Sequence, residues 1–387
     1  MLHCENSSKQ INLLVLPDLM KKAPVTKMVS IASFRTRLVQ THLAGEFLTT
    51  YGSEPTTRHH VMVWITADNG ITGIGEACPL PFTADDDFNH IKRVIDQDLG
   101  PSLLGMDPLD FDLLNENLEE FPLAGGTARA GIDIALHDLA GKLRGVPVYQ
   151  ILGGLSRDYV ELAKVLGIGN PADIANAALQ EVEQGARAIK IKVGIQRDQD
   201  VETLKLVRDV VGDSVRIRAD ANTGYSVDTA LKVLRRTKDI ELEYLEQPIA
   251  ADDHDGLSQI RKESGTSIMA DESLYTLKNA ESLILHKAVD FFGLKLIKHG
   301  GIYRARQIAS LAEEHGIECV VISPWETQIG VSAAVHLVLS GSNFNHPHEI
   351  GTQELADDPV RGLLEDKGTI KVPVGLGLGV DFQNSNL

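Results

Sequence analysis

Charged residues recur at a regular interval through the middle of the chain, each at the end of a short apolar run. In chain order they are Lys190, Lys192, Asp220, Glu246, Asp271 and Lys295. The two lysines in the run 188–193 alternate with isoleucines, so on a strand both ammonium groups point to one face. Burying two cations side by side is costly unless anions or chemistry compensate for them. These residue types could hold a divalent cation between carboxylates and move a proton on lysine nitrogens.

Asp220, Glu246 and Asp271 offer oxygen ligands only. Hard carboxylate oxygens, without sulfur or imidazole, favour Mg²⁺ or Mn²⁺ over Zn²⁺. A single carboxylate at a strand end more often forms an ion pair with lysine or arginine. Three of them in consecutive units, each after an apolar run, instead favour a shared cation. Asn222 follows the first of the three closely and is a candidate to support the metal ligands.

The lysines have two candidate roles. An unpaired lysine beside a cation would have a lowered pKa, which a general base near neutral pH requires. We expect this role for Lys192 and Lys295, and we expect Lys190 to form ion pairs with the acidic cluster. Glu272 could orient Lys295 by charge pairing.

The spacing of these residues indicates the fold that must position them. Successive positions lie roughly 25 residues apart, which is the length of one strand–helix unit of a (β/α)₈ barrel. From a first strand at 160–165 to a last one at 318–323, predicted strands alternate with helices, which indicates a parallel sheet closed into a barrel. The carboxyl ends of barrel strands converge on one mouth. Lys295 lies about four units after Lys192 and so should reach this mouth from the opposite side.

An α+β unit is predicted ahead of the barrel. Strands are predicted at 28–39, 61–65 and 71–76, the last two joined by the hairpin signal Asp68-Asn69-Gly70. The polar segment 42–57 is predicted to be an irregular loop. Helices are predicted at 87–99, at 107–119 beginning with Asp107-Pro108, and at 127–143.

The predicted class is therefore α/β, with a TIM-like (β/α) barrel and an N-terminal α+β domain. The 387 residues suit a barrel of about 250 residues and a second domain. We expect a poorly specified extension at 1–27, the α+β domain at 28–150, and the barrel with the active site at 151–360. The C-terminal segment 361–387 is expected to join the α+β domain.

Composition limits the partners and the compartment. A formal charge of −17 argues against binding to nucleic acid or to an anionic membrane. The three cysteines are far apart, which predicts no disulfide framework and is compatible with a reducing cytoplasm. No apolar stretch approaches the length that spans a membrane, and we expect a cytoplasmic protein.

The order of these residues resembles the enolase superfamily, specifically its muconate-lactonizing-enzyme (mandelate racemase/muconate cycloisomerase) subgroup. The motifs that carry the resemblance are Gly73-Ile74-Gly75-Glu76, Lys190-Ile191-Lys192, Asp220-Ala221-Asn222, Glu246-Gln247-Pro248, Ala270-Asp271-Glu272-Ser273, Lys295 with Gly300-Gly301, and Glu326 with Ile329-Gly330. It implies an enolase-type barrel and an N-terminal domain that caps the mouth. It also implies Mg²⁺-dependent abstraction of the proton α to a carboxylate, through an enediolate.

Mapped by motif, the resemblance implies that Lys192 and Lys295 are the acid/base residues and that Lys190 is an electrostatic helper. Asp220, Glu246 and Asp271 would be the Mg²⁺ ligands. The implied partner is a small-molecule carboxylate, and the family likeness also implies a homo-oligomer. The candidate substrate contacts are Phe47, Tyr51, Phe82, Trp325 and Glu326. Trp325 stands where relatives often carry a small residue or methionine; it could face a cationic or flat substrate group or pack at the rim.

The predicted activity is racemisation or epimerisation of an N-modified amino acid or a related carboxylate, because 1,1-proton transfer needs two bases and a lysine is expected on each side of the metal. After the last strand the chain lacks the Asp-x-Asp with which dipeptide epimerases hold an amino terminus, which argues against a dipeptide but not against an N-acylated or N-alkylated amino acid. Muconate-type cycloisomerisation is the first alternative, and syn dehydration is the second. From a different class, Lys192 or Lys295 could form a Schiff base in an aldolase barrel. A barrel without catalytic activity is a further alternative.

Overall fold

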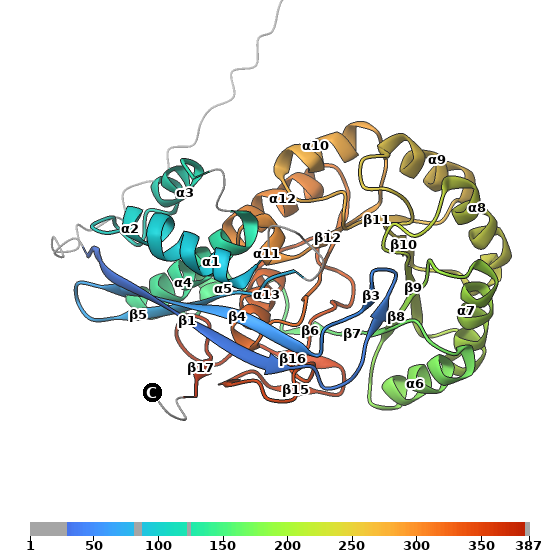
Figure 1. Cartoon of the computed structure of the whole chain (residues 1–387), viewed down its shortest axis with the longest axis horizontal. Coiled ribbons are helices and arrows are strands. Elements are labelled where there is room, and N and C mark those ends of the chain that lie inside the picture. Colours follow the sequence, from blue (N-terminus) through green and yellow to red (C-terminus); the bar gives the residue numbers. More distant parts are fainter. Residues whose placement is uncertain (1–28, 81–86, 122–124, 384–387) are drawn as a thin grey trace, which may run out of the picture.

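The N-terminal part of the chain forms a three-stranded antiparallel sheet. The computed structural model describes residues 29–80, 87–121 and 125–383, so the predicted extension 1–27 lies outside the described residues. The sheet has the order β1-β4-β5, with strands β1 (Ile31–His42), β4 (Thr57–Ala67) and β5 (Thr72–Ala77). Gly70, with φ +85°, makes the predicted turn between β4 and β5. Figure 1 shows this sheet beside the curled barrel.

The segment 42–57 contains a small hairpin, which the prediction of an irregular loop missed. Its strands are β2 (Leu48–Thr49) and β3 (Gly52–Ser53). The Leu48 carbonyl accepts a hydrogen bond from the amide of Ile168 in the barrel, at 2.8 Å. Contacts with the barrel therefore stabilise this hairpin. Strand prediction relies on alternating apolar residues in the local sequence, and contacts with a distant segment do not produce that pattern.

Helices cover one face of this sheet. They are α1 (Phe88–Val94), a π-helical segment (Ile95–Leu99), α2 (Gly100–Ser102), α3 (Phe111–Glu119) and α4 (Gly125–Arg144). The predicted start of α3 at Asp107 is wrong, because Asp107 accepts from the amide of Leu109 in a turn. Asp110 instead caps the helix by accepting from the amide of Leu113 at 3.2 Å.

Helix α4 lies between the sheet and the barrel. It approaches β5 so closely that a Cβ at Gly73 would lie 2.2 Å from the carbonyl oxygen of Ala135. On its other side, Asp133 accepts a hydrogen bond from the amide of Ile302 in the barrel. Asp138 accepts from the amides of Ile74 and Leu378, at 2.7 and 2.8 Å. Small residues in α4 and β5 thus permit close packing of the helix against the sheet.

The barrel sheet contains seven parallel strands in chain order, as predicted for a (β/α) barrel. They are β7 (Ala163–Leu166), β8 (Ala188–Lys192), β9 (Arg216–Asp220), β10 (Tyr244–Glu246), β11 (Ile268–Ala270), β12 (Phe291–Leu294) and β13 (Glu318–Val321). Helices surround the sheet (Figure 1). They are α6 (Pro171–Glu183), α7 (Arg197–Val211), α8 (Val227–Arg236), α9 (His254–Ser264), α10 (Leu277–Leu285), α11 (Leu296–His299), α12 (Ile302–Glu314) and α13 (Gln328–Ser340).

A short segment closes the gap between the first and last barrel strands. His348 forms a parallel bridge with Leu162, and Glu349 forms one with Ile322. The amide of Glu349 donates to the carbonyl of Val321 at 2.9 Å. Strand prediction ended at 323 and missed this closing segment, which places the side chain of Glu349 inside the barrel.

The C-terminal segment returns to both parts of the molecule. β16 (Thr369–Lys371) pairs with β15 (Glu365–Asp366) and β6 (Tyr159–Glu161), and β17 (Asp381–Phe382) pairs with β14 (Val360–Arg361). The predicted first barrel strand at 160–165 is therefore two elements, β6 and β7. α5 (Val148–Ile151) connects α4 to the barrel. Among the described residues, no helix combines the length and the apolar character needed to cross a membrane.

Candidate active site

The predicted carboxylates lie at the carboxyl ends of three adjacent strands. Lys192 at the end of β8 pairs in register with Asp220 at the end of β9, which pairs with Glu246 at the end of β10. Asp271 follows β11 directly, and Lys295 follows β12. Strands β8 and β12 are separated by three strands in the sheet order. The sheet thus presents the carboxylates in its centre, with one lysine on each side.

These three carboxylates are buried, with exposures of 0% for Asp220 and Glu246 and 2% for Asp271. Burial, followed by the charge of Asp220, raises the pKa of Glu246 well above its ordinary value, although Lys190 opposes this. For Asp271 burial also opposes ionisation, but Lys295 and Lys298 outweigh it and lower the pKa. The Oε1 atom of Glu246 is buried and accepts no hydrogen bond within the described part of the chain. Glu246 is therefore the carboxylate of the three whose negative charge the surrounding residues stabilise least.

This donor set fits a hard divalent cation. It consists of carboxylate oxygens from three strands, and one oxygen of Glu246 lacks any partner among the described residues. An unpartnered buried carboxylate oxygen is costly unless a cation or a proton satisfies it. Oxygen ligands without sulfur or imidazole suit Mg²⁺ or Mn²⁺.

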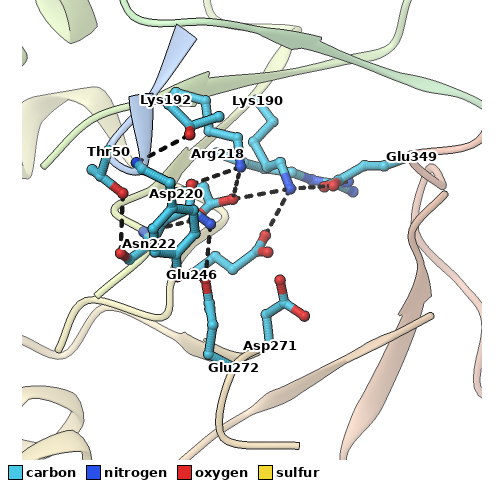
Figure 2. A network of polar contacts seen from close by, with 12 residues as sticks. Thr50, Lys190, Lys192, Arg218, Asp220, Asn222, Glu246, Asp271, Glu272 and Glu349 are labelled. Atoms are coloured by element: carbon cyan, nitrogen blue, oxygen red, sulfur yellow. Dashed lines mark hydrogen bonds and ion pairs between the residues drawn. The ribbon is translucent and has the colours of Figure 1, made fainter. Parts of the chain in front are cut away.

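Lys190 is the ion-pairing residue at the bottom of the site. Its Nζ lies 2.9 Å from Glu246 and 3.4 Å from Asp220, and it also pairs with Glu349 (Figure 2). The other oxygen of Glu349 accepts from Tyr244 at 2.9 Å and pairs with Arg218 at 3.3 Å. The sequence predicted the pairing of Lys190 but missed Glu349, which follows no apolar run that would indicate a strand end.

The predicted acid/base lysines each contact a different carboxylate. Lys192 donates to Asp220 at 2.6 Å and to Asn222 at 2.8 Å, whereas Lys295 donates to Asp271 at 2.6 Å. Burial disfavours the charge of Lys295, but Asp271, followed by Glu272 and Glu246, outweighs burial and raises its pKa. Lys298, which was not in the predicted set, is buried and also pairs with Asp271. Its position three residues after Lys295 was the only signal in the sequence.

A cavity of about 260 Å³ joins these groups to the N-terminal domain. From the barrel, its lining includes both candidate acid/base lysines, Lys190, Asp271, Asn222 and Glu272. From the N-terminal domain, the lining includes Phe47, Tyr51, Glu54 and Leu80. Of the five predicted substrate contacts, Phe47, Tyr51 and Trp325 thus line the cavity. Phe82 lies outside the described residues. Glu326 adjoins the cavity wall at Trp325 but is not among the described lining residues.

Trp325 forms a wall where the two domains meet. Its ring meets the ring of Phe47 edge-on, with centroids 5.3 Å apart. The guanidinium of Arg58 lies 5.0 Å from the Trp325 ring centroid and donates to the carbonyl of Pro324 at 3.1 Å. The cation on this ring is therefore the chain's own arginine. Glu54, which sequence reasoning missed, lies 3.7 Å from Arg58 and also faces the cavity.

Behind Trp325, buried polar groups join the two domains. His60 contacts Glu76 at 2.6 Å and Thr41 at 2.7 Å, so both ring nitrogens have partners. Glu76 in turn accepts from the amide of Thr327 at 2.9 Å. Cys78 lies close enough to share an ion with His60 and Glu76, but these hydrogen bonds already use the two ring nitrogens. We interpret this group as a polar contact between domains.

The pKa of Glu326 makes stability depend on pH. Burial, and then the carboxylate of Glu76, raises this pKa from 4.5 to about 8. The folded protein holds the proton of Glu326 more tightly than the unfolded chain does. The stability that this contributes is fully present below about pH 4.5 and is lost as the pH rises through about 8. Relative to Glu326→Gln, the free energy of unfolding of the original protein should fall by up to about 1.4 kcal/mol per pH unit in this window. Urea unfolding at several pH values measures this, and parallel curves for the two proteins would contradict it.

Comparisons with known proteins agree with this geometry. The model described as "Mandelate racemase / muconate lactonizing enzyme, N-terminal domain" matches residues 34–153. The model described as "Enolase C-terminal domain-like" matches residues 173–386. These matches confirm the resemblance that the motifs indicated, and they cover most of the chain.

Characterised relatives have several isomerase activities. The chain is 30% identical to the N-succinyl-L-Arg/Lys racemase of Bacillus cereus, and the match covers 93% of this chain and 97% of the relative. The solved structure of that racemase has a TM-score of 0.88, covering 92% of this chain and 96% of that one. It is 32% identical to the hydrophobic dipeptide epimerase of Enterococcus faecalis over 82% of this chain and 90% of the relative. A dipeptide epimerase of Enterococcus faecalis that was solved with Mg and the dipeptide L-Leu-L-Tyr is 30% identical, with a TM-score of 0.86, covering 91% of this chain and 99% of that one.

A chloromuconate cycloisomerase of Cupriavidus necator is also similar, at 32% identity over 85% of this chain and 90% of the relative. Each of these relatives is an epimerase, a racemase or a cycloisomerase. The chain therefore belongs to the mandelate racemase/muconate lactonizing enzyme family of the enolase superfamily and is an isomerase of that family.

Proposed function

We propose that this enzyme racemises or epimerises an N-acylated α-amino acid by moving the proton α to its carboxylate. The observation that carries the proposal is that β8 and β12 bring Lys192 and Lys295 to one cavity from separate sides of the sheet. Proton transfer between the two faces of one carbon requires a base on each face. Cycloisomerisation would need only one of these lysines as an acid.

In this proposal the chain's own residues divide the work. Lys192 takes or returns the proton on one face of the α-carbon, and Lys295 does so on the other. Lys190 holds the carboxylates of Glu246 and Glu349 in place. Lys298 holds Asp271.

Asp220, Glu246 and Asp271 would hold Mg²⁺ or Mn²⁺. When bound, the cation would offset the carboxylate charge that raises the pKa of Lys295 and would stabilise the negative charge that develops on the substrate carboxylate.

The cavity and the relatives both favour a substrate without a free amino terminus. After β13 the chain runs Ser323-Pro324-Trp325-Glu326, which offers no pair of carboxylates to a free amino terminus. Phe47, Leu80 and Trp325 instead give the cavity apolar and aromatic walls. These features favour an acylated nitrogen, as in the substrate named for the N-succinyl-L-Arg/Lys racemase.

Deuterium incorporation tests this proposal. The purified protein with Mg²⁺ in D₂O is incubated with the separate L and D forms of N-succinyl-arginine, N-succinyl-lysine and N-acetyl amino acids, and with L-Leu-L-Tyr. We expect α-deuterium and inversion with an N-acyl amino acid, loss of both on adding a chelator, and recovery with Mg²⁺ or Mn²⁺.

Three outcomes would favour other functions. Loss of muconate absorbance without α-exchange of the amino acids would favour a cycloisomerase. Loss of water from a hydroxy acid would favour a dehydratase. Borohydride trapping of a lysine adduct that is insensitive to chelators would favour a Schiff-base aldolase.

A further inference from the structure

The β2–β3 hairpin of the N-terminal domain contacts the barrel next to Lys192. At its tip, the Thr50 hydroxyl donates to the backbone carbonyl of Asn222 at 3.1 Å. The neighbouring residue, Tyr51, donates from its hydroxyl to Oε1 of Glu272 at 2.7 Å. A Cβ at Gly194 would lie 2.8 Å from the Thr50 methyl group, so the hairpin also packs tightly against the loop after β8. Two consecutive residues thus fix the same small region of the barrel mouth.

Glu272 and Asn222 continue this contact to Lys192. Oε1 of Glu272 accepts from Nδ2 of Asn222 at 3.0 Å, and Oδ1 of Asn222 accepts from Lys192 at 2.8 Å (Figure 2). A carboxylate can only accept and an ammonium can only donate. The Asn222 amide therefore satisfies both only when its NH₂ group faces Glu272 and its oxygen faces Lys192. The charge of Glu272 fixes the orientation of the amide, and the amide oxygen positions the lysine nitrogen.

The backbone at Asn222 supports this role. Asn222 and Thr223 have φ of +39° and +65°, in the left-handed region that non-glycine residues rarely adopt. The amide of Asn222 donates to Asp220 at 2.9 Å, and the amide of Thr223 donates to the carbonyl of Gln247 at 2.8 Å. These bonds hold the unusual turn, which directs the Asn222 side chain between Lys192 and Glu272.

The lysine on the other side of the site has a different environment. Lys295 donates to Asp271, which Lys298 also contacts, and both of these residues belong to the barrel. Among the hydrogen bonds of the described residues, the series from the hairpin leads to Lys192 and not to Lys295. The coupling between domain and base is therefore asymmetric.

We propose that Tyr51 and Asn222 are positioning residues, through which the hairpin of the N-terminal domain orients Lys192 for proton transfer on one face of the substrate. This inference rests on the proposed two-base function. It adds that the N-terminal domain influences only one of the two proton-transfer steps. On one face, an α-C–H bond breaks and an N–H bond forms at Lys192, and this step depends on the hairpin. On the other face, the same exchange takes place at Lys295, which forms no hydrogen bond with this series among the described residues; Glu272 acts on Lys295 through its charge, which the Tyr51 and Asn222 side chains do not supply.

Exchange of the α-proton from each enantiomer tests this inference. The probe is the N-acyl amino acid that exchanges fastest with the original protein in D₂O, supplied as pure L or pure D. Lys192→Ala identifies the enantiomer that Lys192 serves, because exchange from that enantiomer is lost. Tyr51→Phe, which removes one hydroxyl, should slow exchange of that enantiomer by roughly fivefold. Asn222→Ala should slow it by about 10²-fold, as expected for a misplaced base.

A matched control removes a similar bond elsewhere. Tyr303 of the barrel donates a hydrogen bond to Asp112 of the N-terminal domain at 2.7 Å. This bond also joins the two domains, but it lies on an exposed part of the surface. Tyr303→Phe should leave exchange from both enantiomers unchanged. In Tyr51→Phe and Asn222→Ala, exchange from the enantiomer that Lys295 serves should stay within about twofold of the original rate, because both variants keep the Lys295–Asp271 contact and the charge of Glu272.

The outcomes separate this inference from the proposed function. Equal losses for both enantiomers, or no loss for either, would overturn the positioning role while exchange by the original protein still supports the function. No exchange by the original protein from either enantiomer of any probe would overturn both.

Discussion

Alanine at Lys192 or at Lys295 is expected to lower the rate of racemisation by about 10³-fold, within the range that a lost general acid or base produces. Each lysine contacts a separate carboxylate, Asp220 or Asp271, and both line the same cavity. Because racemisation needs one base on each face, losing either should stop net inversion in both directions. Polarimetry from each pure enantiomer measures the inversion rate.

Each alanine variant should retain part of the chemistry. The enantiomer that faces the remaining lysine should still exchange its α-proton with solvent D₂O, although it is no longer inverted. Circular dichroism and thermal unfolding serve as controls for an intact fold. A single variant that racemises at the original rate would show that its lysine is not a base in this reaction.

Removing the charge of Lys190 is expected to have the largest effect on stability. Lys190→Met would leave Glu246, Glu349 and Asp220 buried without their shared cation. Breaking a buried ion pair by removing one partner typically costs about 3–5 kcal/mol, because the remaining charge stays buried. We expect a loss of that size in the free energy of unfolding, measured by urea denaturation in the presence of a chelator.

An exposed pair gives the matched control. Lys232 lies 2.6 Å from Asp228 on the surface of α8, where both side chains are largely exposed. Lys232→Met should change stability by less than about 1 kcal/mol. Adding Glu349→Gln to Lys190→Met should restore part of the loss, because it removes one of the three carboxylate charges that Lys190 neutralised. Equal losses in the free energy of unfolding for Lys190→Met and Lys232→Met would contradict a stabilising role of the buried ion pairs.

The regular features of the fold could be predicted because they repeat. Alternating apolar strands and amphipathic helices indicate a parallel barrel, and parallel strands bring their carboxyl ends to one mouth. This alone placed Asp220, Glu246 and Asp271 together and put Lys192 and Lys295 on separate sides. The prediction needed only the local sequence and the rules of barrel geometry.

Features that depend on distant segments could not be predicted in this way. Glu349 enters the barrel on a closing segment that has no strand pattern of its own. The β2–β3 hairpin is polar, and its contacts with Asn222 and Glu272 join residues more than 170 positions apart. The sequence suggested that Glu272 orients Lys295; its hydrogen bonds instead reach Tyr51 and Asn222, while its charge acts on Lys295.

The expected lowering of a lysine pKa also depended on such contacts. That expectation assumed an unpaired lysine, but Lys295 has Asp271 at 2.6 Å. Burial lowers its pKa, and the nearby carboxylates outweigh burial and raise it. Lys298, which was not in the predicted set, has its pKa lowered by burial. The balance between desolvation and charge is set by atoms that only the folded chain brings together.

A crystal structure with Mg²⁺ and an unreactive substrate analogue tests the central claim most directly. The analogue is an N-acyl α-methyl amino acid, which lacks the proton to be removed. We expect the cation at about 2.1 Å from an oxygen of each of Asp220, Glu246 and Asp271. The Nζ atoms of Lys192 and Lys295 should lie on opposite faces of the α-carbon. A cation bound elsewhere, or both nitrogens on the same face, would contradict the two-base mechanism.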